Sequence, residues 1–247
     1  MIQEATGIVL KSTPFSDTSM VTRVFTREFG KISLMAKGIR KSKKGTGGIL
    51  EPMNKINFQV NYNDTKDLQL LRELSLISPL TKIRSDYKRL TTGLAMVDMI
   101  DKTMQPKDAS TILFRLLNHS LKELNNSGSN VAYLYLFFQF QLAKYSGFNP
   151  LPHQCYVCQK DLVECYLDKS SGHQYCNLCI NHDSIFLPEN CCEFLNKLSQ
   201  TFISEIHNLI IDDNELNIVQ NYIHSFLILH LHGIEKAKSV QLVVQNF

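Results

Sequence analysis

The chain has 247 residues, of which 44% are hydrophobic and 20% charged, a composition typical of a folded globular protein rather than a disordered one. Its net charge of +3 is too small to indicate a nucleic-acid partner by itself. No segment reaches the roughly 18 consecutive apolar residues of a membrane helix. The first residues, MIQEATGIVLKS, lack the basic start and the cleavage site of a signal peptide. We therefore expect a cytoplasmic protein with no membrane partner, in which thiols stay reduced.

Positive charge is concentrated in the first third of the chain. Residues 1–80 contain 12 Lys or Arg and 7 Asp or Glu, whereas the rest of the chain has a small net negative charge. Such an asymmetry between chain regions is a hint of a module that binds a polyanion.

The first 80 residues are predicted to form short strands separated by turn-forming stretches. The five β-branched or alternating segments are GIVLKS, SMVTRVFT, GKISLMAKG, INFQVNY and LQLLRELSLIS. Five strands in about 80 residues are too few for a typical sandwich and suit a small barrel of the OB type. An open antiparallel sheet is the alternative.

From about Lys82 the apolar residues recur at steps of three and four, which predicts helices. Helical segments are expected at residues 82–100, 110–124, 131–146, 192–206 and 215–234. The third of these is apolar nearly all round, so we expect it to be a central buried helix.

These patterns predict an α+β protein with two domains. Residues 1–80 would form the OB-fold barrel, and residues 81–247 a helical domain. A Cys-rich, irregular insert at about 151–187 interrupts the helical domain.

Two CxxC pairs lie within this insert, separated by 17 residues. They are formed by Cys155, Cys158, Cys176 and Cys179. Each pair can turn two thiolates to one side of a tight knuckle, and the hairpin between the pairs, turning near DKSSG, brings all four together. Four thiolates around Zn²⁺ leave no open position for water. The spacing therefore predicts one structural zinc ion per chain.

Other interpretations of the cysteines are a disulfide framework, a redox pair and an iron–sulfur cluster. Nothing indicates secretion, and no strand of a thioredoxin-like unit precedes either pair. Cys165, Cys191 and Cys192 fall outside the spacing and are expected to be buried. His153, His173 and His182 flank the predicted ligands and are expected to lie at the surface.

The densest cluster of charge is a segment that leaves the third predicted strand and enters a glycine-rich loop. Its five cations are Lys37, Arg40, Lys41, Lys43 and Lys44. Such cations neutralise phosphates, and glycines let the backbone approach them closely. Arg23, Arg27 and Lys31 lie close in sequence and would extend the basic surface. A solvated loop without a partner is the alternative.

Single-stranded nucleic acid on an OB barrel lies in a charged groove with aromatic side chains beneath its bases. The aromatic candidates are Phe15, Phe25, Phe29, Phe58 and Tyr62, most of which strand alternation assigns to the core. No Walker A, H-E-x-x-H, G-x-S-x-G or deaminase motif occurs, so we do not expect an enzyme.

Several of these segments together resemble the RecO family of bacterial recombination mediators. The opening strand GIVLKS is followed by FSDTSMVTRVFTREFGK, by the loop KGIRKSKK and by ILEP. The CxxC pairs and a C-terminal GIEKAKS stretch come later. One departure is Gln159, which stands where the family often has Gly directly after the first CxxC. Some members of the family lack the cysteines altogether.

The resemblance implies an OB-fold DNA-binding domain over residues 1–80 and a helical domain over residues 81–247 that carries the zinc insert. It implies binding of single- and double-stranded DNA and annealing of complementary strands. It also implies partnership with RecR, contact with the tail of single-stranded-DNA-binding protein and, indirectly, loading of RecA. Such a protein would be cytoplasmic and associated with the nucleoid.

Two functions of other classes stay open. One is a protein-interaction scaffold whose helical domain binds acidic tails, for which Lys236 and Lys238 are available if they do not simply complement the dipole of their own helix. The other is a zinc-ribbon factor that binds RNA, which a preference for RNA over DNA of equal sequence would favour.

Overall fold

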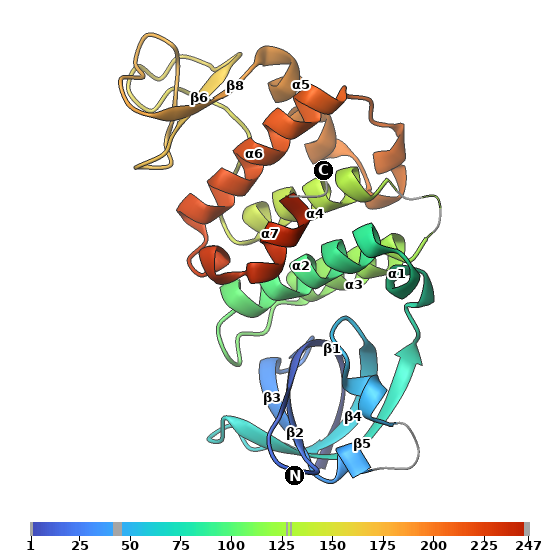
Figure 1. Cartoon of the computed structure of the whole chain (residues 1–247). Coiled ribbons are helices and arrows are strands. Elements are labelled where there is room, and N and C mark those ends of the chain that lie inside the picture. Colours follow the sequence, from blue (N-terminus) through green and yellow to red (C-terminus); the bar gives the residue numbers. More distant parts are fainter. Residues whose placement is uncertain (1, 42–45, 127, 129, 245–247) are drawn as a thin grey trace. The chain divides into compact units, whose positions relative to one another are not determined.

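The computed structural model describes residues 2–41, 46–126, 128 and 130–244 of the chain. The chain divides into two compact units (Figure 1). The first, which we call the barrel unit, comprises residues 1–127 and 236–246. The second, which we call the insert unit, comprises residues 128–235.

Five strands of the barrel unit close into a barrel. They are β1 (Ile2–Pro14), β2 (Met20–Thr26), β3 (Gly30–Ala36), β4 (Lys55–Asn61) and β5 (Leu68–Ser78). The order is β1-β2-β3-β5-β4, with β3 and β5 parallel and every other pair antiparallel. This order is that of an OB fold, so the predicted barrel is confirmed and the open sheet is wrong.

Alternation along the strands fills the barrel. In β3 the side chains of Ile32, Leu34 and Ala36 point inward, and the residues between them are half-buried. Together with residues such as Val24 and Phe58 from β2 and β4, they form the apolar core of the barrel. Because the side chains of a strand alternate between faces, Arg23 of β2 and Lys31 and Ser33 of β3 are left partly exposed.

Four helices belong to the barrel unit. They are α1 (Thr81–Ser85), α2 (Tyr87–Thr103), α3 (Thr111–Leu124) and α7 (Lys238–Val244). The sequence predicts one helix from Lys82, but Asp86 is extended and breaks it, and its carboxylate accepts a hydrogen bond from the N–H of Arg89. A short polar side chain of this kind caps a new helix more favourably than it continues an old one. The helix α7 was not predicted, and Lys238 begins it rather than ending a helix.

The helices of the insert unit surround a central one. They are α4 (Val131–Tyr145), α5 (Glu189–Gln200) and α6 (Asp213–His230). In α4 every residue from Ala132 to Ala143 is buried, so the predicted central helix is confirmed. The helix predicted at residues 192–206 ends at Gln200, since Thr201 and Phe202 are extended and a short 3₁₀ turn follows.

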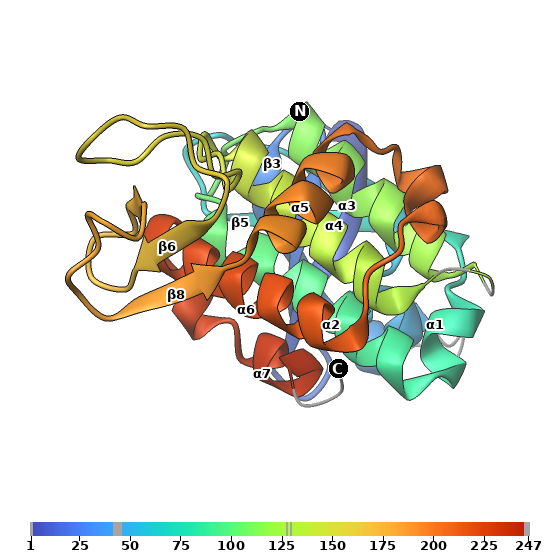
Figure 2. The same ribbon diagram turned by 90° about the horizontal axis from the view of Figure 1, so that it is seen from above.

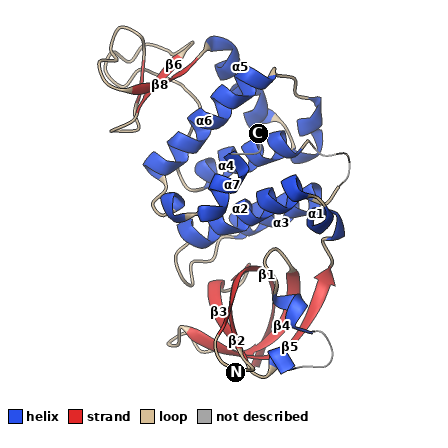
Figure 3. Cartoon of the chain, in the orientation of Figure 1, coloured by secondary structure: helices blue, strands red, loops and turns tan. Residues whose placement is uncertain are grey.

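The Cys-rich insert contains a three-stranded sheet in the order β7-β6-β8. The strands are β6 (Cys165–Asp168), β7 (Gln174–Tyr175) and β8 (Ser184–Leu187), and Figures 2 and 3 show β6 and β8 side by side. The buried Tyr222 of α6 anchors the insert, because its hydroxyl donates to the carbonyl of Pro150 (2.9 Å) and accepts from Gln174 (2.7 Å). Within the described residues, no helix is long and apolar enough to cross a membrane.

Candidate metal centre and nucleic-acid interface

The four cysteines of the CxxC pairs meet at one point of the insert, with all four sulfur atoms within 4.8 Å of one another. The Sγ atoms of Cys158 and Cys176 lie 3.7 Å apart. A tetrahedron with Zn–S bonds of about 2.3 Å has edges of about 3.8 Å. The four thiols are therefore placed as one metal ion would require, and among the described residues no other group of potential ligands converges in this way.

Backbone N–H groups favour the thiolate of Cys155, whereas the pKa of Cys179 is raised to about 12, chiefly by its hydrogen bond with the Cys176 side chain. Burial of the Cys155 thiol opposes ionisation, but N–H groups of Cys158, Cys176 and Val157 donate to its sulfur and lower its pKa to about 6. In the second pair a tight turn is closed by the N–H groups of Cys179 and Ile180, which both donate to the Cys176 carbonyl (3.1 Å each).

The remaining cysteines are protonated thiols. Burial is the main cause that raises the pKa of Cys165 to about 12, of Cys191 to about 11 and of Cys192 to about 12. Cys165 and Cys191 are buried, as predicted, whereas Cys192 is half-buried. None of these three belongs to the group of four converging sulfur atoms.

The hairpin between the two pairs turns where the sequence predicts. Asp168, at the end of β6, accepts from the N–H groups of Ser170 (2.6 Å) and Ser171 (2.9 Å) and from the Ser170 hydroxyl (2.6 Å). These hydrogen bonds lower the pKa of Asp168 to about 2, and the one from the Ser170 hydroxyl contributes most. The turn that brings the second CxxC pair to the first is thus closed by one carboxylate.

Gln159 adopts the left-handed conformation, with a φ of 60°, directly after the first knuckle. This conformation costs most residues about 1–2 kcal/mol but costs glycine nothing. The Gln159 side chain offsets part of the cost, because its amide donates to the carbonyls of Cys155 (3.2 Å) and Tyr156 (3.0 Å). The turn therefore explains why glycine suits this position and how glutamine is tolerated.

We expect Gln159→Gly to change the free energy of unfolding by less than about 1 kcal/mol, because relief of strain offsets the lost hydrogen bonds. Gln159→Val should lower it by about 2 kcal/mol, since a β-branched residue is poorly accommodated at positive φ. Urea denaturation of the metal-loaded protein measures both, with Lys160→Val as the control at the neighbouring exposed position. Equal effects of the two substitutions at Gln159 would contradict the strain argument.

The basic segment leaves β3 and makes a short 3₁₀ turn at Ile39–Lys41. Ile39 is buried in the barrel core, while Lys37, Arg40 and Lys41 are exposed on either side of it. The buried residue anchors the turn and directs its neighbours into solvent. Among the residues that the structure describes, none of these three cations forms an ion pair with a carboxylate. Lys43 and Lys44 lie outside the described residues.

Arg40 joins the basic turn to the loop between β1 and β2. Its backbone N–H donates to the carbonyl of Thr18 (3.0 Å), and its guanidinium donates to the carbonyl of Ser16 (2.7 Å). Because both acceptors are neutral carbonyls, the guanidinium keeps its full positive charge. The two loops therefore form one edge of the barrel.

Arg23 and Lys31, the predicted extensions on β2 and β3, are both directed at Asp101 of α2. The Arg23 guanidinium lies 2.8 Å from the Asp101 carboxylate and the Lys31 ammonium 4.0 Å from it. Lys102 lies 3.9 Å from the same carboxylate. Neither Asp101 oxygen has a well-directed hydrogen bond among the described residues, so charge pairing is what compensates its burial. Arg23 and Lys31 thus have a structural partner.

Lys31 is the most enclosed of the three cations, with 11% of its side chain exposed. Burial lowers its pKa from 10.5, the Asp101 carboxylate opposes this shift, and Arg23 and Lys102 reinforce it. The remaining predicted cation, Arg27, is well exposed and pairs with the adjacent Glu28 at 2.9 Å. Exposed pairs of this kind are weak and leave Arg27 accessible.

Asp101→Asn should lower the free energy of unfolding by about 2 kcal/mol, since it leaves Lys31 half-desolvated without a counter-charge. The loss is smaller than for a fully buried ion pair because Arg23 is partly exposed and its charge is screened by solvent. Chemical denaturation checks it, with Asp17→Asn, the same change at an exposed loop position, as the control. If the two variants were equally stable, the three cations would not depend on Asp101.

The aromatic candidates separate clearly by burial. Phe25 and Phe58 are both buried, Phe58 in the barrel core and Phe25 near Phe114 of α3, with ring centroids 6.0 Å apart. Phe29 and Tyr62 are half-buried, and their rings stack with centroids 4.3 Å apart. Phe15 is different, because 65% of it is exposed. The sequence offered a signal for this, since Phe15 lies inside the turn-forming TPFSD stretch rather than in an alternating strand.

Sequence reasoning missed Asp101 as the partner of Arg23 and Lys31. The residues are about 70 positions apart, and an acidic residue near the end of a helix has no local feature that reveals such a pairing. It also noted Gln159 only as a departure from a family pattern, because a backbone dihedral angle is not visible in one sequence.

The fold and the two clusters define a class: an OB-barrel protein with an exposed basic turn and a helical body carrying four converging cysteines that could hold a metal ion. The description "Recombination protein O N terminal" matches residues 1–80, and "Recombination protein O C terminal" matches residues 84–239. The chain belongs to the recombination protein O family.

Individual relatives agree with this assignment. A "DNA repair protein RecO" from Salinibacter ruber is 32% identical over 144 residues, which are 58% of this chain and 55% of that protein. One from Chloroherpeton thalassium is 30% identical over 171 residues, covering 69% of this chain and 66% of the relative. One from Pelodictyon phaeoclathratiforme is 23% identical, but the match covers 99% of this chain and 98% of the relative.

Proposed function

We propose that this protein is a non-enzymatic recombination mediator in DNA repair. It binds single- and double-stranded DNA, anneals complementary strands and, with RecR, helps load RecA on DNA coated by single-stranded-DNA-binding protein, whose tail it contacts. Residues 1–80 act as the DNA-binding domain and residues 81–247 as the helical domain, in the cytoplasm and on the nucleoid.

The observation that carries the proposal is the exposed basic turn on an OB barrel in a chain of this family. Lys37, Arg40 and Lys41 are exposed and, among the described residues, have no carboxylate partner. Two DNA strands repel each other through their phosphates, and cations that contact both strands lower this repulsion and release counterions. Lys43 and Lys44 are proposed to add to the same surface, with Arg27 at its margin.

Arg23 and Lys31 take a lesser part in this proposal. Both are paired with Asp101, so their charge is partly neutralised before DNA arrives. Their contribution to DNA affinity should accordingly be smaller than that of the turn cations.

The metal that the four cysteines would hold is one structural zinc ion. Four sulfur atoms within 4.8 Å of one another suit Zn²⁺, and four such ligands leave no open coordination position, so the ion would stabilise the insert and take no part in a reaction.

Annealing of two complementary labelled oligonucleotides tests the proposal, first with naked strands and then with coated ones. The wild type is compared with a triple variant of the basic turn, Lys37→Ala, Arg40→Ala and Lys41→Ala. The control variant removes the same charge from three exposed lysines of the insert unit, Lys144, Lys160 and Lys197. We expect annealing by the wild type and the control and little by the triple variant.

Two results would count against the proposal in different ways. If the folded wild type did not anneal strands, the mediator function would be wrong, and a scaffold that binds acidic tails would become the better hypothesis. If the triple variant annealed as fast as the control, the function would stand but the basic turn would not be its DNA-binding surface.

A further inference from the structure

Phe15 lies in the loop between β1 and β2 with 65% of it exposed to solvent. Exposing an aromatic ring costs hydrophobic free energy, and a ring at a loop tip contributes little to the barrel core. Isolated exposed apolar residues are common on surfaces, so exposure alone indicates nothing. What distinguishes Phe15 is how its loop is held and which residue holds it.

The loop is fixed at both ends by hydrogen bonds. The N–H of Phe15 donates to the carbonyl of Ser19 at 3.1 Å, which closes the turn, and Ser19 donates back to the hydroxyl of Ser16 at 3.3 Å. Ser19 itself is buried. A ring on such a turn is presented to solvent at low further entropy cost, which is what a binding platform requires.

The residue that secures the outer side of this loop is a cation of the basic turn. Arg40 donates to the carbonyls of Ser16 and Thr18, which lie on either side of Asp17, the one acidic residue between β1 and β2. The guanidinium is thus fixed on the residue adjacent to Phe15, and it retains its charge. The fold therefore fixes an exposed cation on the same loop that carries the exposed ring of Phe15.

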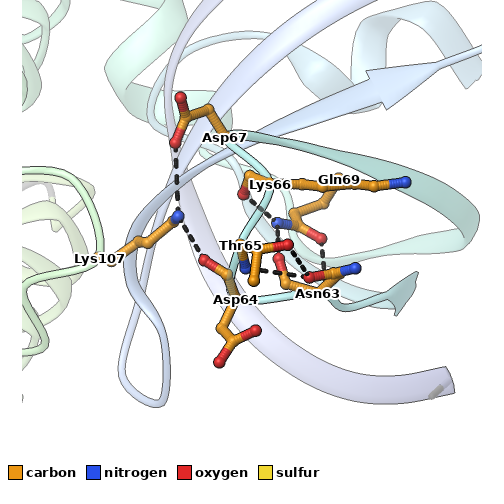
Figure 4. A network of polar contacts seen from close by, with 7 residues as sticks. All are labelled: Asn63, Asp64, Thr65, Lys66, Asp67, Gln69 and Lys107. Carbon is orange, nitrogen blue, oxygen red and sulfur yellow. Dashed lines mark hydrogen bonds and ion pairs between the residues drawn. The ribbon is translucent and has the colours of Figure 1, made fainter.

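In many OB folds the loop between β4 and β5 also binds ligands. In this protein the charged residues of that loop differ from those of the basic turn. Figure 4 shows its contacts, in which buried Gln69 bonds to the backbone of Asn63 and Lys66. Lys107 donates to the carbonyl of Asp64 (2.6 Å) and lies 3.4 Å from the carboxylate of Asp67. This loop presents the carboxylates of Asp64 and Asp67 beside the single cation of Lys66, and Lys107 contacts it from the segment between α2 and α3. It therefore lacks the excess of positive charge that the basic turn offers a polyanion.

We propose that Phe15 is a base-stacking site for single-stranded DNA, in which one unpaired base rests on the ring while Arg40 contacts the adjacent phosphate. The inference rests on the proposed function and adds to it a preference for unpaired strands. Every base has a π-face, so the contact is tolerant of sequence. A paired base in a duplex is already stacked on its neighbours, so Phe15 distinguishes single strands from duplexes while the cations do not.

The test measures affinity for a single-stranded oligonucleotide and for its duplex as a function of salt. Phe15→Ala should weaken single-strand binding about tenfold, leave duplex binding unchanged and leave the salt dependence of log K unchanged. Phe15→Tyr should bind as the wild type does, whereas Phe15→Leu, apolar but not aromatic, should bind as weakly as Phe15→Ala.

A direct readout uses the absence of tryptophan from the chain. Phe15→Trp creates a single tryptophan, whose fluorescence should be quenched by a single-stranded oligonucleotide but not by an abasic one with the same phosphates. Phe202→Trp, at another well-exposed phenylalanine (72% exposed), is the matched control and should not be quenched.

The outcomes separate the two proposals. If all Phe15 variants bind single strands equally well and the tryptophan is not quenched, the stacking site is wrong while DNA binding stands. If Phe15→Ala weakens single strands and duplexes equally, the residue holds the loop and does not bind a base. If the wild type binds neither the single-stranded oligonucleotide nor the duplex, both the proposed function and the stacking site are wrong.

Discussion

Removing the three described cations of the basic turn should weaken binding of single-stranded DNA about 100-fold near 0.1 M salt. Each lost phosphate contact lowers the slope of log K against log salt by about 0.7 on a single strand, so the slope should fall by about 2 for Lys37→Ala, Arg40→Ala and Lys41→Ala together. On a duplex the same change should be nearer 3, since each contact there is worth about 0.9. Fluorescence anisotropy titrations at several salt concentrations measure both slopes.

The slope is more informative than the affinity at one salt concentration. A variant that is merely less stable loses active molecules but keeps the slope of the wild type. The triple alanine variant of Lys144, Lys160 and Lys197 has the same net charge as the turn variant, so it controls for long-range attraction. Equal slopes for the two triple variants would show that the turn makes no phosphate contacts.

Cys155→Ser should release the metal and lower the melting temperature of the protein by roughly 10 °C. Cys155 is fully buried and receives backbone N–H bonds, so a serine there neither binds zinc well nor fills the position of the sulfur. Structural zinc contributes folding free energy, and losing it belongs to the largest single-residue effects, on the order of 3 kcal/mol or more. Metal analysis and differential scanning calorimetry measure the two effects.

Cys192→Ser is the matched control for this prediction. Its thiol is half-buried and protonated, and its hydrogen bond to the carbonyl of Leu187 can be kept by a hydroxyl. We expect one zinc per chain in the wild type and in this variant. Less than about one zinc in wild-type protein purified without chelators would contradict the assignment of the site.

The barrel could be predicted because its determinants are local. The inward residues of β3, Ile32, Leu34 and Ala36, alternate with polar ones, and Gly30, with a φ of 64°, marks the turn before them. The convergence of the cysteines could be predicted for the same reason, since CxxC spacing fixes a knuckle and DKSSG fixes the hairpin. In both cases neighbouring residues contain the information.

The features that the sequence did not predict depend mostly on contacts between distant segments. Asp86 divides α1 from α2 although the apolar periodicity runs through it, because the capping preference of one side chain outweighs the continuing pattern. The helix α7 packs on α2, and the N–H of Ser239 donates to Asp98, across more than a hundred residues. The ion pair between Arg23 and Asp101 also joins segments that are distant in sequence. It lowers the contribution that we expect Arg23 to make to DNA affinity.

Loading of RecA on single-stranded DNA coated with single-stranded-DNA-binding protein tests the mediator function most directly. DNA-dependent ATP hydrolysis by RecA reports loading, measured with this protein and RecR together, with each alone, and with the triple turn variant. The proposed function predicts a shortened lag only when wild-type protein and RecR are both present, and no shortening with the variant. An unchanged lag in the presence of both, with a wild-type protein that is folded and metal-loaded, would contradict it.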